Sequence, residues 1–96
     1  MDSFGHKDIS ELRPQEHVVS TAFEGGEGVL VDLNTKKYFQ LNDTAMLVWR
    51  GLEKGKAFEE IVGDMTAEYD VTPEHAAESV RKLLGSLRGL KLVRPR

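Results

Sequence analysis

Residues 28–42 have the sequence GVLVDLNTKKYFQLN, and this stretch decides the fold. Val29–Leu33 is the most apolar short run in the N-terminal half, as expected for a strand buried on both faces and therefore central in its sheet. The polar run 34–37 predicts a tight turn, because asparagine tolerates left-handed backbone geometry. Lys37–Leu41 then predicts a second strand, antiparallel to the first.

A third candidate strand lies upstream. His17–Phe23 is rich in β-branched residues, and the glycine-rich run 24–28 supplies a turn back toward the central strand. The three segments together predict an antiparallel meander. Residues 1–16 are polar and lack periodicity, so we expect a flexible N-terminal segment there and a folded domain over residues 17–96.

Downstream, the hydrophobic period lengthens to about 3.6 residues, which indicates helices. Asn42 can cap the first helix. A second helix is expected over Phe58–Tyr69, with a poor cap because alanine precedes it. The third helix has the clearest start, since Thr72 can cap it and Pro73 suits its first position. The sequence predicts a winged-helix-like α+β fold in which a three-stranded antiparallel sheet is followed by three helices.

Composition and motifs argue against several classes of function. The chain has 96 residues and no cysteine, which excludes disulfides, thiolate metal sites and cysteine nucleophiles. No apolar run approaches the roughly 20 residues of a membrane span, and the first residues lack a signal-peptide pattern. We therefore expect a cytoplasmic protein without membrane contact.

Catalytic residues do not gather in any recognisable pattern. The three histidines, His6, His17 and His75, lie in separate segments, and none pairs with another at the spacing of metal ligands on a helix. The glycine-rich run 24–28 lacks the lysine and the hydroxyl residue of a phosphate loop. Trp49 belongs to the core positions of the first helix. We expect no enzyme, no catalytic residue, no metal and no cofactor.

The surface offers a different kind of site. Lys37–Leu41 is expected to be an edge strand, and an edge strand beside an amphipathic helix makes a groove that a peptide can enter by adding a strand. On the third helix, Ala77, Arg81, Leu84 and Arg88 recur next to the core stripe and would present an apolar floor with two cations. Periodicity alone is equally compatible with residues that only border the core.

Charge is unevenly distributed along a chain whose net charge is −3. Glu59–Glu78 contains seven acidic residues, whereas Arg81–Arg96 contains six basic residues and no acidic one. One interpretation is a solvated helix whose cations suit the negative end of its dipole. The other is a site for an acidic partner.

Several short runs follow one another along the chain in an order that can be compared with known families: Gly28–Leu33, Lys37–Asn42, Thr44–Ala45, Val48–Trp49, Gly55, Glu59–Val62, Tyr69–Val71 and Val80–Leu87. No single run is specific. The ordered set, which covers about residues 12–93, resembles the PqqD-like family of precursor-peptide recognition elements.

The resemblance implies a non-catalytic domain that binds the leader segment of a ribosomally made precursor peptide. Such domains present the leader to a partner peptidase or modifying enzyme. The family uses the third strand as the edge for the incoming peptide, and the third helix closes the groove. The implied peptide-binding residues, with those on the helix chosen by periodicity, are Lys37, Tyr38, Phe39, Gln40, Leu41, Ala77, Val80, Arg81, Leu84 and Arg88. We expect a monomer.

Two alternatives stay open. The pyrroloquinoline quinone branch tends to carry a Pro-Glu pair between its second and third strands, where this chain has Asn34–Lys37. The resemblance is therefore closer to the stand-alone modules of lasso-peptide pathways, and a peptide chaperone in pyrroloquinoline quinone synthesis is the first alternative. The second is a winged-helix DNA-binding protein. The net charge, and a third helix made largely of core leucines, argue against nucleic acid as the partner.

Overall fold

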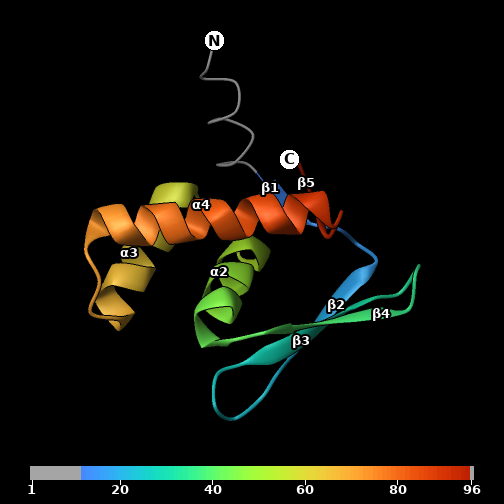
Figure 1. Ribbon diagram of the computed structural model, residues 1–96. Coiled ribbons are helices and arrows are strands. Elements are labelled where there is room, and N and C mark those ends of the chain that lie inside the picture. Colours follow the sequence, from blue (N-terminus) through green and yellow to red (C-terminus); the bar gives the residue numbers. More distant parts are fainter. Residues whose placement is uncertain (1–11, 96) are drawn as a thin grey trace.

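A computed structural model of the chain describes residues 12–95. Strands β2 (Val18–Ala22), β3 (Gly28–Asp32) and β4 (Lys37–Leu41) form an antiparallel sheet in the order β2-β3-β4 (Figure 1). The most apolar strand, β3, is central, and Leu30 at its middle is completely buried. The predicted meander is therefore confirmed.

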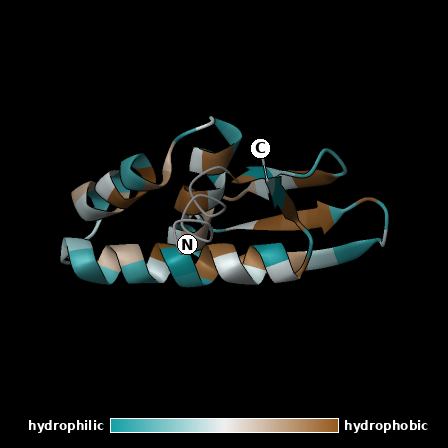
Figure 2. Ribbon diagram, turned by 90° about the horizontal axis from the view of Figure 1, so that it is seen from above, coloured by the Kyte–Doolittle hydropathy of each residue, from teal (hydrophilic) through white to brown (hydrophobic). Residues whose placement is uncertain are grey.

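Three helices follow the sheet: α2 (Asp43–Glu53), α3 (Phe58–Glu68) and α4 (Pro73–Gly89). They complete the predicted α+β fold. Helix α2 lies between the sheet and the other two helices (Figure 1). Hydrophobic and hydrophilic residues alternate in bands along α4, the long helix nearest the lower edge of Figure 2, because one stripe of this helix is buried and the opposite stripe is exposed.

Local capping explains where the helices begin. The side chain of Asn42 accepts a hydrogen bond from the third residue of α2, and Thr72 does the same for α4, at 2.9 and 3.2 Å. Ala57 has no side-chain acceptor at the start of α3. Instead, Glu60 Oε1 reaches back and accepts from the N–H of Ala57 at 2.9 Å.

A network of two hydrogen bonds joins α2 to the sheet. Trp49 is completely buried, and its indole N–H donates to Glu53 Oε2 at 2.8 Å. The hydroxyl of Ser20 on β2 donates to the same carboxylate oxygen at 2.9 Å. Trp49 is thus a core residue, as the sequence predicts, and its polar atom is satisfied.

The chain also has a two-stranded sheet that the sequence does not reveal. Strand β1 (Leu12–Pro14) pairs antiparallel with β5 (Val93–Pro95). Leu12 is buried against the core at 2% exposure, so the expectation of a flexible segment is wrong for these residues. The partner of β1 lies at the far end of the chain, and no local pattern encodes such a pairing. The rest of that expectation, residues 1–11, lies outside the described residues.

The carboxylate of Asp32 organises the turn between β3 and β4. Its Oδ1 accepts hydrogen bonds from the N–H groups of Asn34 and Thr35, at 2.9 and 3.2 Å, and His17 Nε2 lies 3.7 Å away. Burial raises the pKa of this carboxyl, but the hydrogen bonds and the imidazole outweigh it and hold the pKa below its usual value. The turn that leads into β4 is therefore fixed by an ionised side chain.

Acid should loosen this turn. The ordinary pKa of aspartate, about 3.9, applies to the unfolded chain, and the folded value is lower. The stabilising contribution is therefore complete above about pH 4 and is lost as the pH falls through the folded pKa. In thermal denaturation from about pH 7 to about pH 2.5, we expect Asp32→Asn to be less stable than the wild type near neutrality and to lose less stability with acid. Identical pH profiles would contradict this role.

Candidate functional site

Strand β4 has an edge that no other strand of residues 12–95 covers. In an antiparallel ladder, successive residues direct their backbone groups alternately to one neighbour and the other. The N–H of Leu33 donates to the carbonyl of His17 at 2.8 Å, on the β2 side of the sheet. The N–H of Phe23 donates to the carbonyl of Glu27, also at 2.8 Å. The odd-numbered residues of β3 are therefore bonded to β2, and the even-numbered ones face β4.

The same alternation assigns the backbone groups of β4. The even-numbered residues of β3 lie opposite Lys37, Phe39 and Leu41, so these three residues use their N–H and C=O groups within the sheet. Tyr38 and Gln40 direct theirs to the open edge. A peptide that joined the sheet as a fourth strand would pair with these two residues.

Side chains of β4 alternate between the two faces of the sheet. Leu41 is buried at 8% exposure, and Phe39 packs against the core on the face that α2 covers. Tyr38 lies on the outer face and is 72% exposed. The two aromatic residues point to opposite faces, so an added strand would have one side against the helices and one side toward solvent.

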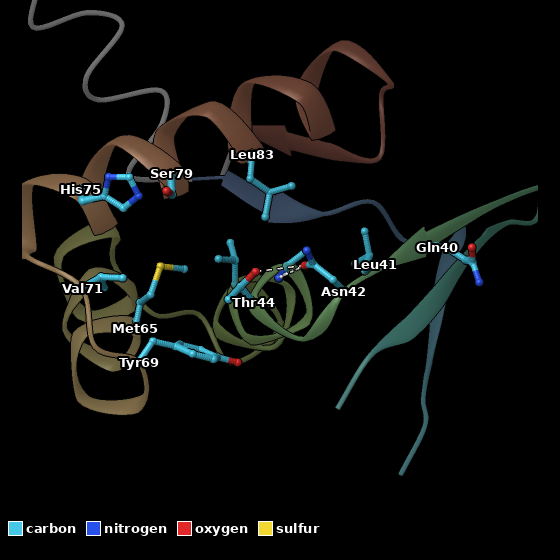
Figure 3. A pocket seen from close by; sticks show the side chains of 12 residues that line it. Gln40, Leu41, Asn42, Thr44, Met65, Tyr69, Val71, His75, Ser79 and Leu83 are labelled. Atoms are coloured by element: carbon cyan, nitrogen blue, oxygen red, sulfur yellow. Dashed lines mark hydrogen bonds between the residues drawn. The ribbon is translucent and has the colours of Figure 1, made fainter. Parts of the chain in front are cut away.

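A cavity of about 470 Å³ opens where β4 ends (Figure 3). Its walls come from β4, α2, α3, the loop after α3, and α4: Gln40, Leu41, Asn42, Thr44, Ala45, Val48, Met65, Tyr69, Val71, His75, Ser79 and Leu83. In Figure 3 the side chains of His75, Ser79 and Leu83 project from α4 toward this space, one turn apart. Most of the lining is apolar, which suits the burial of a nonpolar side chain.

Tyr69 forms the wall of the cavity opposite α4 (Figure 3). Burial raises the pKa of its hydroxyl, and a hydrogen bond to the Asp43 carboxylate raises it further. Asp43 and Tyr69 both line a second cavity, so the start of α2 and the residue after α3 lie close together there.

The predicted residues fall into two groups. Gln40 and Leu41 line the cavity, and Tyr38 supplies edge groups, as a β4 site requires. None of the five predicted α4 residues lines it. Val80 and Leu84 are buried in the core, at 0% and 1% exposure.

The other three α4 residues lie on the flank away from the cavity. The guanidinium carbon of Arg81 is 5.6 Å from the ring centroid of Phe58 on α3, so this side chain packs between the helices. Arg81 is about 160° around the helix from Leu83. Ala77 and Arg88 share the flank of Arg81. Helical periodicity identifies the buried stripe but leaves its two borders equivalent, and the sequence analysis selected the border that faces α3.

Ten cavity residues were missed by the sequence analysis: Asn42, Thr44, Ala45, Val48, Met65, Tyr69, Val71, His75, Ser79 and Leu83. They come from three helices and the connections beside them. Leu83 carried a positional signal, because it is an apolar residue on the border of the core stripe, and Asn42 carried only the signal of a helix cap. The others become recognisable only when the packing of the helices is known.

Two negative findings apply to residues 12–95. No three histidine, cysteine, aspartate or glutamate side chains in this range are grouped so that they could hold a metal ion. No helix in the same range is both long enough and apolar enough to cross a membrane.

Comparison with known proteins adds the family. Residues 27–93 match the model of PqqD, described as coenzyme PQQ synthesis protein D. The chain belongs to the PqqD family. The match spans the central strand, the edge strand, all three helices and the start of β5, so every wall of the cavity lies inside the PqqD match. No curated protein matches the chain by sequence.

Two solved structures are similar to this PqqD-family chain. TbiB1, solved in complex with the TbiA(beta) leader peptide, is 34% identical, with a TM-score of 0.79 over 84% of this chain and 93% of its own. A lasso peptide synthetase B1 complexed with the leader peptide is 29% identical, also with a TM-score of 0.79, over 90% of this chain and 100% of its own.

Proposed function

We propose that this chain binds the leader segment of a ribosomally made precursor peptide as a fourth strand on β4. The observation that carries the proposal is the open edge at Tyr38 and Gln40, which leads directly to an apolar cavity beside α4. The similarity to two chains that were solved with leader peptides supports it.

The expected binding free energy requires contributions from both the open edge of β4 and the cavity. Tyr38 and Gln40 offer one N–H and one C=O each, so the edge can make four backbone hydrogen bonds, worth together about 2–6 kcal/mol net. Association itself costs about 4–15 kcal/mol, so the edge alone gives little affinity. Burying a leucine-sized side chain in the cavity adds about 1.5–3 kcal/mol. We therefore assign affinity to the edge and cavity together, and specificity to the cavity.

This assignment revises the helix residues. The α4 residues that we propose to contact the peptide are His75, Ser79 and Leu83, in place of the five chosen by periodicity. On β4 all five predicted residues are kept. Tyr38 and Gln40 pair with the peptide directly, Leu41 lines the cavity, and Lys37 and Phe39 bond to β3 through their backbone.

A substitution of Arg81 distinguishes the helix residues chosen by periodicity from those that line the cavity. We expect Arg81→Glu to change the affinity for the peptide by less than about twofold, because the side chain lies on the far flank. It should lower the free energy of unfolding by about 0.5–1 kcal/mol through the lost contact with Phe58. Titration calorimetry and thermal denaturation measure the two effects. A tenfold loss of affinity in a folded variant would restore the original choice of helix residues.

The downstream role we propose is presentation of the leader to a partner peptidase or modifying enzyme. Val19, Val31 and Tyr38 lie side by side across the outer face of the sheet, and Val19 and Tyr38 are 45% and 72% exposed. A peptide added to β4 would extend this apolar row, so a partner could contact protein and peptide together. We expect Val19→Arg to leave peptide affinity unchanged but to reduce processing by the partner; normal processing would contradict this surface.

A lasso-peptide pathway is the setting we favour. One relative is described as a lasso peptide synthetase B1, and Asn34–Lys37 replaces the Pro-Glu pair of the coenzyme branch. A peptide chaperone in pyrroloquinoline quinone synthesis is the alternative within the family. We do not propose DNA binding. Arg81 packs on Phe58, and the first turns of α4 expose Glu74 and Glu78, whose negative charges would repel phosphates. In the favoured role the chain is a monomeric cytoplasmic binding module, and the partner supplies the chemistry.

Titration calorimetry with a synthetic leader tests the proposal. The leader is taken from a short precursor reading frame encoded beside this protein, and a scrambled peptide of the same composition is the control. We expect saturable one-to-one binding of the leader only. No heat from the leader, or equal binding of the scrambled peptide, would contradict the proposed function.

A further inference from the structure

Acidic residues surround the cavity end of the groove. Asp70 and Glu74 are exposed, and each is the chain neighbour of at least one residue that lines the cavity. Neither makes an ion pair with another residue in the range 12–95. Asp43 and Glu68 instead line a second cavity, where Arg50, Lys54 and Lys56 also lie. Glu78 also borders the cavity, but it is paired with Lys82 at 3.8 Å. The mouth of this apolar cavity therefore carries a net negative charge.

Basic residues gather at the opposite end of β4. Lys36 and Lys37 are exposed where the turn enters the strand, and Lys91 and Arg94 are exposed beyond the end of α4. The C-terminal end of α4 and the turn before β4 lie at the same end of the molecule, on the right in Figure 1. Among the described residues, none of these four cations has an ion-pair partner.

Backbone geometry defines where two of these lysines attach to the chain. Lys36 and Lys91 adopt left-handed φ angles of 65° and 62°. The N–H of Lys36 donates to the carbonyl of Asp32 at 2.7 Å, and that of Lys91 to the carbonyl of Arg88 at 3.0 Å. Both lysines belong to hydrogen-bonded turns, so their backbone positions relative to the groove are defined and their exposed side chains start from fixed points.

The two charged ends are far enough apart to act separately. From Lys37 to Leu41 the strand advances about 13 Å, at roughly 3.3 Å per residue. The Debye length at physiological ionic strength is about 8 Å, so the field of one end is largely screened at the other. A peptide that spans the groove therefore meets an acidic rim at the cavity and a basic rim at the turn.

We propose that the groove selects its peptide by the order of its charges, with basic residues over the cavity end and acidic residues over the turn end. This inference rests on the proposed function and deepens it. Backbone pairing at Tyr38 and Gln40 accepts almost any sequence, so it cannot distinguish one leader from another. A peptide with the reversed order would face like charges at both ends, and this repulsion rejects it.

A displayed library of random 14-residue peptides provides the test, because such a library can be used before the leader has been identified. The library is selected on the purified chain, and peptides are kept only if they fail to bind Leu83→Asp, a variant altered in the cavity wall. We expect the retained peptides to carry basic residues near one end and acidic residues near the other. Exchanging the two charged ends of one such peptide should weaken its binding about five- to tenfold at low salt, and less at high salt.

A pair of surface variants assigns the acidic end. Selection on Lys36→Glu/Lys37→Glu should remove the preference for acidic residues. Lys54→Glu is the matched control, because this lysine follows the C-terminal end of α2 and lines a second cavity of about 410 Å³, not the turn that leads into β4. It should leave the preference unchanged.

The outcomes distinguish this inference from the function on which it rests. Peptides that depend on Leu83 but show no order of charges would overturn the charge selection and leave leader binding intact. A preference for acidic residues that persists in selection on Lys36→Glu/Lys37→Glu would also overturn the charge selection. Failure to recover any peptide that depends on Leu83 would overturn the proposed groove itself, and the charge selection with it.

Discussion

Replacing Leu83 by aspartate is expected to weaken leader binding by about 2–4 kcal/mol, which is roughly 30-fold to 1,000-fold. Leu83 projects from α4 into the cavity and is only partly buried in the free protein (Figure 3). A bound peptide would cover it. The aspartate variant therefore loses an apolar contact and must also bury a carboxylate that has no cation beside it in the cavity wall.

Leu83→Met is the matched control for this substitution. Methionine conserves the volume and the apolar character, so affinity should change by less than about 1 kcal/mol. Circular dichroism and thermal denaturation verify that both variants fold, and titration calorimetry gives the affinities. If folded Leu83→Asp binds the leader as tightly as the wild type, the cavity is not part of the binding site.

Proline at Gln40 is expected to have the second large effect, a loss of about 1.5–3 kcal/mol of binding free energy. The N–H of Gln40 points to the open edge, so its removal deletes one bond to the peptide and leaves a peptide carbonyl without a partner. The bonds between β3 and β4 are untouched, because Gln40 and Val29 face each other in a pair without direct hydrogen bonds. The fold should therefore tolerate the change.

Two neighbouring substitutions control for this one. Gln40→Ala keeps the backbone donor and should bind within about threefold of the wild type. Phe39→Pro removes a donor that faces β3, so it should lower the stability of the protein itself. Equal affinities of Gln40→Pro and the wild type would show that the peptide does not pair with this edge.

The elements that the sequence predicted correctly are those with local signals. The capping residues Asn42 and Thr72 indicate where α2 and α4 begin. The apolar run Val29–Leu33 predicts a central strand. Strand β1 has no such signal, because its three residues become a strand only beside β5, some 80 residues later in the chain. Leu12 is buried through that pairing, and composition alone could not reveal it.

The residues of the candidate site show the same difference between local sequence signals and long-range packing. An edge strand follows from the order of the meander, so β4 was predicted with its correct bounds. The choice of helix face stays a prediction, because the borders of the α4 stripe are distinguished only by what packs on them. Phe58 takes the border that carries Arg81, and the border that carries Leu83 remains open to the cavity. The residues of α2 and α3 in the cavity wall depend on packing between helices in the same way.

Amide hydrogen exchange, followed by NMR with and without saturating leader peptide, tests the central claim most directly. The N–H groups of Lys37, Phe39 and Leu41 bond within the sheet and should be protected in the free protein. Those of Tyr38 and Gln40 should exchange quickly in the free protein and slow by about tenfold or more when the leader is bound. Saturable binding that leaves the exchange of Tyr38 and Gln40 unchanged would contradict strand addition at β4.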